Sequence, residues 1–508
     1  MAQKEKGVTL QLVKVSSKSS LFELTGKFGH DKPLKRIFQI ILSQGCKTIV
    51  VENEYEDSDY KNEYENFYKK LFKTYAQNTQ RLHFFSSNIT KTSLGKLGSF
   101  ENTYLGFCVL RPFQYQKVVN AIIKPTEDCN PSKRSFVLCQ EDFNIEIKIN
   151  SRNTQKLKIR GFPFKQQDGQ LGCCAHASLA TIDHFLAHKN RKKPCDLSDI
   201  IEKAAQVPDT RRAVPSTGLN AVQISQALKG MGYVPLIYQY GEGIRSPFPA
   251  ERVIYHYMES GIPIMLGIPT SSSGHALTII GHSFEPDMWW ALAQSEYYRR
   301  RPSGGPYHCS TTWIQNFIIH DDNFGPYLTI PKEFIWEKAA KEGLLIVVPL
   351  PEDVNIQGED AEIYAYRMIS DQIITEKMME MSLENKITQK WCEVFFDHLQ
   401  NEDLVLRTCL LDSKKFKKEY TSENLKEFYK TLAMPNKIWL TEVSIPELFC
   451  QSRLRLGEVI TDSTSNMKFG HSFLAIHLPG IVVTRDVNTE KIKYFPLKED
   501  LPFGHIIR

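Results

Sequence analysis

The stretch QQDGQLGCCAHASLATIDHF, from Gln166 to Phe185, places two adjacent cysteines directly before a segment with helical periodicity. Apolar side chains then recur on one helical face, at Ala175, Leu179, Ile182 and Leu186. This spacing predicts a helix that begins at the cysteines, and Gly172 gives the preceding turn the freedom to bend. We expect this helix to pack on a sheet formed by the strands that follow it.

Those strands are predicted by a series of apolar runs: IPIMLGI, HALTIIGH, FIIHDD, LTIP and LLIVVPL. A further helix is expected at LNAVQISQALKGMGY, where Asn220 is a plausible N-cap, Gln223 follows three residues later and Gly232 lies near the end. Helices followed by strands, rather than alternating βαβ units, indicate an α+β fold.

The length of 508 residues suggests about three domains. We expect an N-terminal α+β domain without an assignable role at 1–152, a catalytic domain at 153–350, and a helical and mixed domain at 351–508. The proline- and acid-rich joint PEDVNIQGEDAE marks the last boundary. Beyond it, EIYAYRMISDQIITEKMMEM predicts one helix and ITQKWCEVFFDHL another.

Composition argues against several classes of protein. A net charge of +5 is small for this length and gives no case for nucleic-acid binding. No apolar run approaches the roughly 20 residues of a membrane-spanning helix, and the N-terminus lacks an apolar signal region. The eleven cysteines are scattered and include no C-x-x-C pair, unlike a disulfide framework or a structural zinc site. We therefore expect a cytoplasmic protein.

The paired cysteines raise the question of a nucleophile. Cysteine reacts as the thiolate, and a helix N-terminus lowers the thiol pKa through its unpaired N–H groups and dipole. Cys174 lies at the first helical position, whereas Cys173 lies one residue earlier, on the loop side. If one of them reacts, the position favours Cys174; the alternative is that both only pack, as most cysteines in apolar surroundings do.

A cysteine nucleophile needs a base, an acid to orient that base, and an oxyanion donor. His275 begins the strand HALTIIGH and is the candidate base. Asp321 and Asp322 end the strand FIIHDD and either could accept the second imidazole N–H, although such pairs also form turns. Three glutamines precede the cysteines and could supply a side-chain amide: Gln166, Gln167 and Gln170.

The segment CAHASLA, from Cys174 to Ala180, resembles the Cys-Gly-Pro-Ala-x-x-Ala start of the nucleophile helix in papain-like peptidases that process double-glycine leader peptides. In that family an upstream glutamine completes the oxyanion hole, a Gly-His pair opens a strand, and an Asp-Pro turn supplies the orienting acid. The resemblance implies these roles for Gln167, His275 and Asp321.

Further strings extend this resemblance. YLGFCVLRP, PFKQQD and IIHDDNFGPY are similar to those of a group of bacterial proteins with the same papain-like centre. The run D-x-x-x-G-P, which ends at Pro326, resembles the aspartate turn of the leader peptidases and favours Asp321 over Asp322.

The sequence therefore predicts a cysteine hydrolase, first of all a peptidase. Cys174, His275 and Asp321 would form its triad, and Gln167 would bind the oxyanion. The enzyme would act on a protein or peptide through a thioester, with no metal, organic cofactor or nucleic acid. The papain-like core would consist of the nucleophile helix on an antiparallel sheet. The flanking domains would choose the substrate or regulate access to the site.

Several alternatives stay open. The same triad could transfer an acyl group to an amine, as transglutaminase-like enzymes do, or cleave non-peptide amides. The scaffold could also be catalytically inactive and only bind a partner. A weaker possibility is a metal cluster, with these candidate ligands: Cys174, His275, His282 and His320.

Two further features can be interpreted either as structural or as part of a substrate-binding site. His176 lies on the opposite side of the helix start and would contact substrate only if the site extends there. The loop SEYYRRRPSGGPYHC carries Arg299, Arg300 and Arg301; it is either a solvated insertion or a loop that grips acidic peptides.

Overall fold

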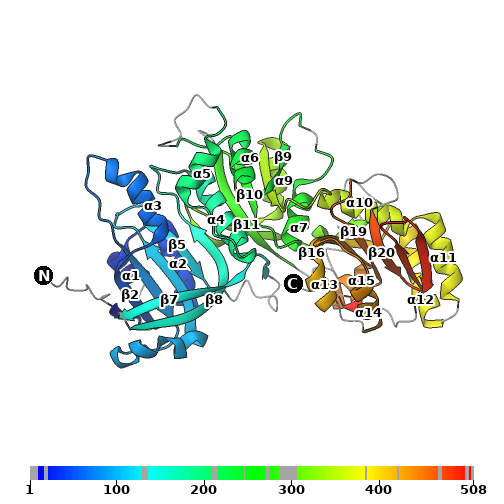
Figure 1. Ribbon diagram of the computed structural model, residues 1–508, viewed down its shortest axis with the longest axis horizontal. Helices are drawn as coiled ribbons and strands as arrows, with labels where there is room; N and C mark the ends of the chain where they lie inside the picture. Colours follow the sequence, from blue (N-terminus) through cyan, green and yellow to red (C-terminus); the bar gives the residue numbers. More distant parts are fainter. Residues whose placement is uncertain are drawn as a thin grey trace.

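The computed structural model describes residues 10–16, 21–126, 135–150, 152–208, 214, 216–244, 246–270, 274–284, 306–383, 386–419, 423–452, 454–466, 472–497 and 503–504. These residues form three seven-stranded sheets and one two-stranded pair. The sheets follow one another along the long axis of the molecule in chain order (Figure 1). None of the described helices combines the length and the apolar character needed to cross a membrane.

The first sheet is antiparallel, with the strand order β1-β2-β3-β4-β5-β8-β7. Its strands are β1 (Leu10–Lys14), β2 (Thr48–Tyr55), β3 (Thr79–Phe85), β4 (Tyr104–Leu110), β5 (Val118–Ile123), β7 (Glu141–Asn150) and β8 (Asn153–Lys165). Its helices are α1 (Leu21–Phe28), α2 (Lys32–Ser43), α3 (Ser58–Asn66), η1 (Tyr68–Lys70) and η2 (Lys91–Thr103). Because side chains alternate between the faces of a strand, Ile49 and Val51 join the core with α2, whereas Val50 joins a second core with Tyr60 and Tyr68.

The middle sheet has the order β14-β13-β11-β10-β15-β9, and β6 pairs with the end of β11. Its strands are β6 (Ser135–Val137), β9 (Val234–Tyr240), β10 (Ile264–Pro269), β11 (Gly274–Ser283), β13 (Asn316–Asp321), β14 (Gly325–Pro331) and β15 (Leu344–Leu350). Its helices are α4 (Cys174–Lys189), α5 (Leu197–Ala204), α6 (Ala221–Gly230), α7 (Ala250–Glu259), η6 (Ser310–Trp313) and α9 (Lys332–Lys341). Helix α4 contacts both β8 and β11, so it lies between the first and middle sheets (Figure 1).

Two helices begin where the sequence predicts. Helix α4 starts at Cys174 with Cys173 as its N-cap, and all four residues of the predicted apolar face are buried. Helix α6 has Asn220 as its N-cap, and the Asn220 and Gln223 side chains each accept a backbone N–H of the other residue. Local periodicity and capping therefore define both helices.

The third sheet has the order β12-β16-β17-β19-β20-β21-β22. Its strands are β12 (His308–Cys309), β16 (Val405–Asp412), β17 (Lys437–Ser444), β19 (Gly457–Asp462), β20 (Phe473–Leu478), β21 (Ile481–Arg485) and β22 (Ile492–Pro496). A small pair is formed by β18 (Leu454–Arg455) and β23 (Phe503–Gly504). The helices are α10 (Gly358–Ile369), α11 (Gln372–Ser382), α12 (Lys386–Gln400), α13 (Ser413–Glu419), α14 (Glu423–Thr431) and α15 (Pro446–Ser452).

In this part of the chain, the prediction of one continuous helix is wrong. The segment EIYAYRMISDQIITEKMMEM forms two helices, because α10 ends at Ile369 and α11 begins at Gln372. The carboxylate of Asp371 accepts the backbone N–H groups of Ile373 and Ile374 and so caps a new helix. An aspartate that bonds its own backbone in this way competes with a continuous helix.

Strand pairing crosses the limits between the three expected domains, and those limits stay a prediction. Strand β8 pairs with β5 and β7, so the first sheet extends to Lys165, past the boundary expected at residue 152. Strand β6 reaches from the first part of the chain to the middle sheet, and β12 reaches from the middle part to the third sheet. Neighbouring parts of the chain are therefore interleaved.

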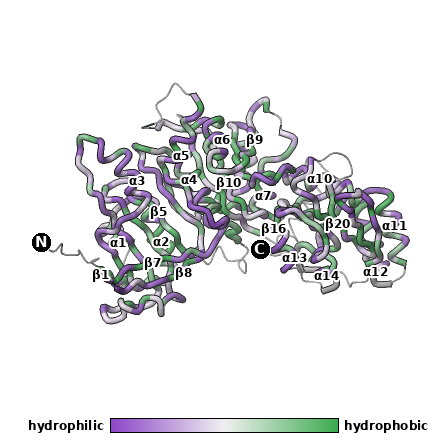
Figure 2. Tube along the Cα trace, viewed as in Figure 1, coloured by the Kyte–Doolittle hydropathy of each residue, from purple (hydrophilic) through white to green (hydrophobic). Residues whose placement is uncertain are grey.

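The hydropathy of the chain follows the arrangement of strands and helices. Figure 2 shows hydrophobic residues along the sheet strands, as at β10, and along α2, whereas α3 is largely hydrophilic. The fold is a mixed α+β arrangement of antiparallel sheets with helices, as the sequence predicts at this level. The only parallel pairing among the described strands is that of β12 with β16.

Candidate active site

The two cysteines at the start of α4 face different neighbours. Cys174 Sγ accepts the backbone N–H of Ala276 in β11 at 3.4 Å. Cys173 Sγ lies 3.1 Å from His176 Nδ1, one turn further along α4. Cys174 is therefore the cysteine beside the strand that carries His275, and Cys173 turns toward His176.

The charge of this thiol pair differs from the expectation. A hydrogen bond from Cys174, together with nearby His176, lowers the pKa of Cys173. The same bond, and then burial, raises the pKa of Cys174, while the N–H of Ala276 acts in the opposite direction. The helix N-terminus was expected to favour a Cys174 thiolate, but the neighbouring thiol competes for that charge. Cys174 consequently needs a base to lose its proton.

His275 is held by a carboxylate in the way such a base requires. Its Nε2 lies 3.0 Å from Asp321 Oδ2 and 3.9 Å from Asp322 Oδ1, so Asp321 is the nearer partner. Burial opposes a charged imidazole, but the bond to Asp321 and the charges of both aspartates outweigh it and raise the pKa of His275. The ring keeps Nδ1 for a second contact, and its side chain is 19% exposed.

Asp322 is an unusual neighbour. Its side chain is buried, and neither carboxyl oxygen has a hydrogen-bond partner among the described residues. Burial and the charge of Asp321 raise its pKa to about 7, although His275 acts against this rise. The candidate site thus holds two adjacent aspartates in different surroundings, one bonded to the imidazole and one buried with a raised pKa.

The three glutamines before the cysteines have different surroundings. Gln167 Nε2 donates to Asn323 Oδ1 at 3.2 Å, and Asn323 Nδ2 lies 3.5 Å from His275 Nδ1. Gln166 instead uses its side-chain oxygen to accept the N–H of Val118, and Gln170 is exposed. Of the three candidates, only Gln167 is brought to the histidine by a described contact.

Asn323 lies beside the candidate site, and it is not among the site residues predicted from the sequence. Its N–H donates to Asp321 Oδ1 at 2.8 Å, as in an aspartate turn. Its side chain also bridges Gln167 and His275. The only signal in the sequence is its position two residues after Asp321, which any aspartate turn would share.

Two groups among the described residues have the spacing of metal ligands. One is His275 with Asp321 and Asp322; the other is the buried set His256, Cys309 and Glu362. In the second group Glu362 already bonds to His256 at 2.9 Å and to Arg252 at 2.7 Å, as in a buried ion-pair network.

The histidines proposed as further metal ligands do not join His275. His282 Nε2 lies 2.6 Å from Glu259 Oε1, and His320 Nδ1 lies 3.2 Å from the carbonyl oxygen of Pro163. Burial lowers the pKa of His320 to about 3. The predicted substrate-gripping arginines, Arg299 to Arg301, lie outside the described residues.

Comparisons with known proteins add little detail. No family model and no curated protein matches the sequence significantly. Among solved structures, the chain is similar to the peptidase domain of Streptococcus ComA, a bi-functional ABC transporter involved in a quorum-sensing pathway. The identity is 13% and the TM-score 0.20, over 36% of this chain and 98% of that chain.

It is also similar to UfSP from C. elegans, with 19% identity and a TM-score of 0.22, over 38% of this chain and 33% of that chain. Likeness of this degree carries no argument about chemistry.

Proposed function

We propose that this protein is a papain-like cysteine hydrolase that cleaves peptide bonds, with Cys174 as its nucleophile. The observation that carries the proposal is the meeting of α4 and β11. Cys174 Sγ lies 3.4 Å from the N–H of Ala276, and the preceding residue, His275, is bonded to Asp321 at 3.0 Å. These two contacts support a site in which the thiol, the imidazole and an orienting carboxylate act together.

In the proposed reaction, His275 Nδ1 takes the proton of Cys174 while Asp321 accepts the N–H at Nε2 and stabilises the imidazolium. The thiolate attacks the carbonyl carbon of the substrate. The C–N bond then breaks, and the leaving amine takes the proton from His275. Water, deprotonated by His275, hydrolyses the thioester, releases the acid and restores the thiol. The scheme uses no metal and no organic cofactor.

The oxyanion of the tetrahedral intermediates needs donors on the other side of the carbonyl. The backbone N–H of Cys174 lies at the N-terminus of α4, and the Gln167 side-chain amide is the second candidate. Its Nε2 carries two N–H groups, so one can donate to the oxyanion while the other stays bonded to Asn323.

Labelling of the intact protein with a thiol-directed acylating probe tests the proposal. We expect Cys174→Ala to abolish labelling and Cys173→Ala to retain it. Equal labelling of the two variants, or loss only in Cys173→Ala, would overturn the assignment. Cys173→Ala is a matched control because it removes the adjacent sulfur with the same change of volume.

A further inference from the structure

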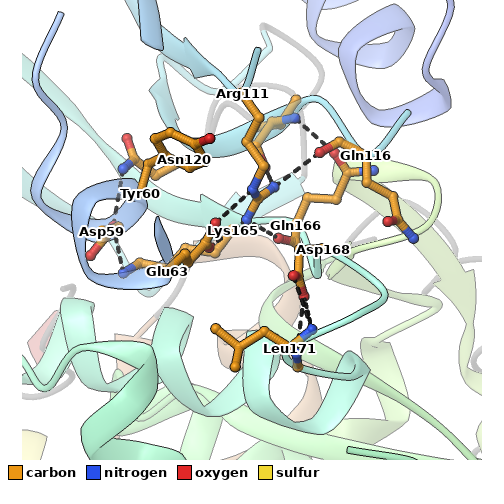
Figure 3. A network of polar contacts seen from close by, with 12 residues as sticks. Asp59, Tyr60, Glu63, Arg111, Gln116, Asn120, Lys165, Gln166, Asp168 and Leu171 are labelled. Atoms are coloured by element: carbon orange, nitrogen blue, oxygen red, sulfur yellow. Dashed lines mark hydrogen bonds and ion pairs between the residues drawn. The ribbon is translucent and has the colours of Figure 1, made fainter. Parts of the chain in front are cut away.

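The loop from Gln166 to Gly172 is fixed by the first sheet on the side before Gln167 (Figure 3). Buried Arg111 bonds to Glu63 through Nε at 2.8 Å and Nη2 at 2.6 Å, and Nη2 also donates to the carbonyl of Gln166 at 3.2 Å. The side-chain oxygen of Gln166 accepts the N–H of Val118 in β5 at 2.9 Å. Both the main chain and the side chain of Gln166 are therefore held.

The residue after Gln167 is fixed as well. Tyr68 Oη donates to Asp168 Oδ2 at 2.5 Å, and both groups are buried. The Asp168 carboxylate also accepts the backbone N–H groups of Leu171 and Gly172, each at 3.0 Å, which shapes the turn into the cysteines. Figure 3 shows Arg111, Gln166, Asp168 and Leu171 along this one path.

Gln167 lies between the two fixed residues, Gln166 and Asp168, but its own side chain points to neither of their partners. Its amide donates to Asn323, which in turn lies 3.5 Å from His275 Nδ1. Polar contacts from Arg111 and Tyr68 thus hold the two residues that flank Gln167, and the Gln167 side chain itself reaches Asn323 beside the histidine proposed above as the base. A small cavity beside Cys173 and Gln167 is also lined by Glu63 and Arg111.

We propose that Tyr68 and Arg111 are positioning residues for the oxyanion donor Gln167, so that the first sheet builds part of the active site. This inference rests on the proposed function. A buried ion pair such as Arg111–Glu63 is weak evidence for stability alone, but here the remaining guanidinium donors fix the backbone beside Gln167. A donor acts on an oxyanion only when it is held in place before the reaction, and a displacement of about 1 Å can lower a rate about 100-fold.

Two reagents separate positioning of the donor from support of the fold. Both rates are read at Cys174 in a Cys173→Ala background, because the lowered pKa of Cys173 would make it a second target. Iodoacetamide alkylates a thiolate by displacement at a saturated carbon, forming a C–S bond and releasing iodide, so no oxyanion develops. p-Nitrophenyl acetate acylates the same thiolate through a tetrahedral oxyanion and releases p-nitrophenolate; water then frees acetate. Only the second rate depends on the donor.

We expect Tyr68→Phe to lower the acylation rate about tenfold while the alkylation rate stays within about twofold of wild type. Gln167→Ala should show the same selective loss. The matched control is Tyr60→Phe, which removes a buried hydroxyl of the same core that donates to the Ala76 carbonyl at 2.7 Å rather than to Asp168. This control should lower the unfolding midpoint but leave both rates unchanged.

Equal acylation by Tyr68→Phe and Tyr60→Phe would overturn the inference, as would a parallel fall of both rates. Should Tyr68→Phe not fold, Asp168→Asn tests the same anchor from the loop side and is expected to lose acylation selectively. Failure of the proposed function is recognised separately, because Cys174→Ala would then still be acylated at the wild-type rate.

Discussion

Two histidines of this protein each bond to a carboxylate, but their pKa values shift in opposite directions. His83 in the first sheet lies 3.0 Å from Glu52 Oε2, and His275 in the middle sheet lies 3.0 Å from Asp321 Oδ2. Burial, with the charge of Arg81, lowers the pKa of His83 to about 4 despite Glu52, whereas the two aspartates raise the pKa of His275.

The difference lies in what surrounds each pair. His83 is fully buried, and Arg81 shares the carboxylate of Glu52, so the imidazole stays neutral. His275 is partly exposed, and among the described contacts no arginine or lysine pairs with the aspartates beside it as Arg81 pairs with Glu52. A histidine–carboxylate pair therefore indicates a base only when the imidazole can take and release a proton and a reactive group lies beside it.

Replacing each histidine should separate the two roles most strongly. We expect His275→Gln to lower acylation by p-nitrophenyl acetate about 10,000-fold, because the thiol loses its base, with little change in the unfolding midpoint. His83→Gln should cost about 1–3 kcal/mol of unfolding free energy, because a buried bond is disturbed, yet keep its activity. Loss of acylation in both variants at equal folded fraction would contradict this distinction.

The two aspartates of the site sharpen the comparison further. Asp321→Asn should lower acylation roughly 1,000-fold, because the amide cannot hold the imidazolium as the carboxylate does. Asp322→Asn, at 3.9 Å from Nε2, should lower it less than about tenfold. Pre-steady-state release of p-nitrophenolate measures both, and the reverse order would make Asp322 the orienting acid.

Stability against pH tests the state of Asp322. Its folded pKa of about 7 is above the unfolded value, so its contribution is fully present below about pH 4 and is lost as the pH rises toward 7. Asp322→Asn carries no such charge. In urea unfolding we expect the variant to match wild type at pH 4 and to be a few kcal/mol more stable at pH 8. An equal difference at both pH values would refute a raised pKa.

The smallest effect is expected at Asn323. Its side-chain amide lies 3.5 Å from His275 Nδ1, the atom that takes the proton of Cys174 in the proposed reaction, so His275 must leave this contact before it acts. Asn323→Ala should therefore raise the acylation rate about threefold, the equivalent of one modest hydrogen bond. A slower rate, at unchanged alkylation by iodoacetamide, would mean that Asn323 assists the reaction.

The sequence predicts the local parts of this molecule well. The start of α4 at Cys174, its buried face, the strand at His275 and the strand that ends at Asp321 all follow from periodicity and caps. Each depends on residues within a few positions of one another. The site remains a prediction, but its histidine and aspartate do meet.

Long-range partners could not be predicted. Arg111 finds Glu63 across 48 positions, and Tyr68 finds Asp168 across 100. No period or spacing links such residues, because only the pairing of the sheets brings them together. The same reason explains why the pairing of β7 with β8 could not be predicted, since a hairpin that continues a sheet has no distinct composition.

The pairing of β12 with β16 has a practical consequence for anyone who expresses a part of this protein. A truncated chain that ends near Leu350 would keep β12 but lose β16, with which it pairs. A chain that begins there would keep β16 with the edge exposed that β12 covers in the whole protein. Exposed strand edges recruit other chains, so both fragments should aggregate where the intact polypeptide does not.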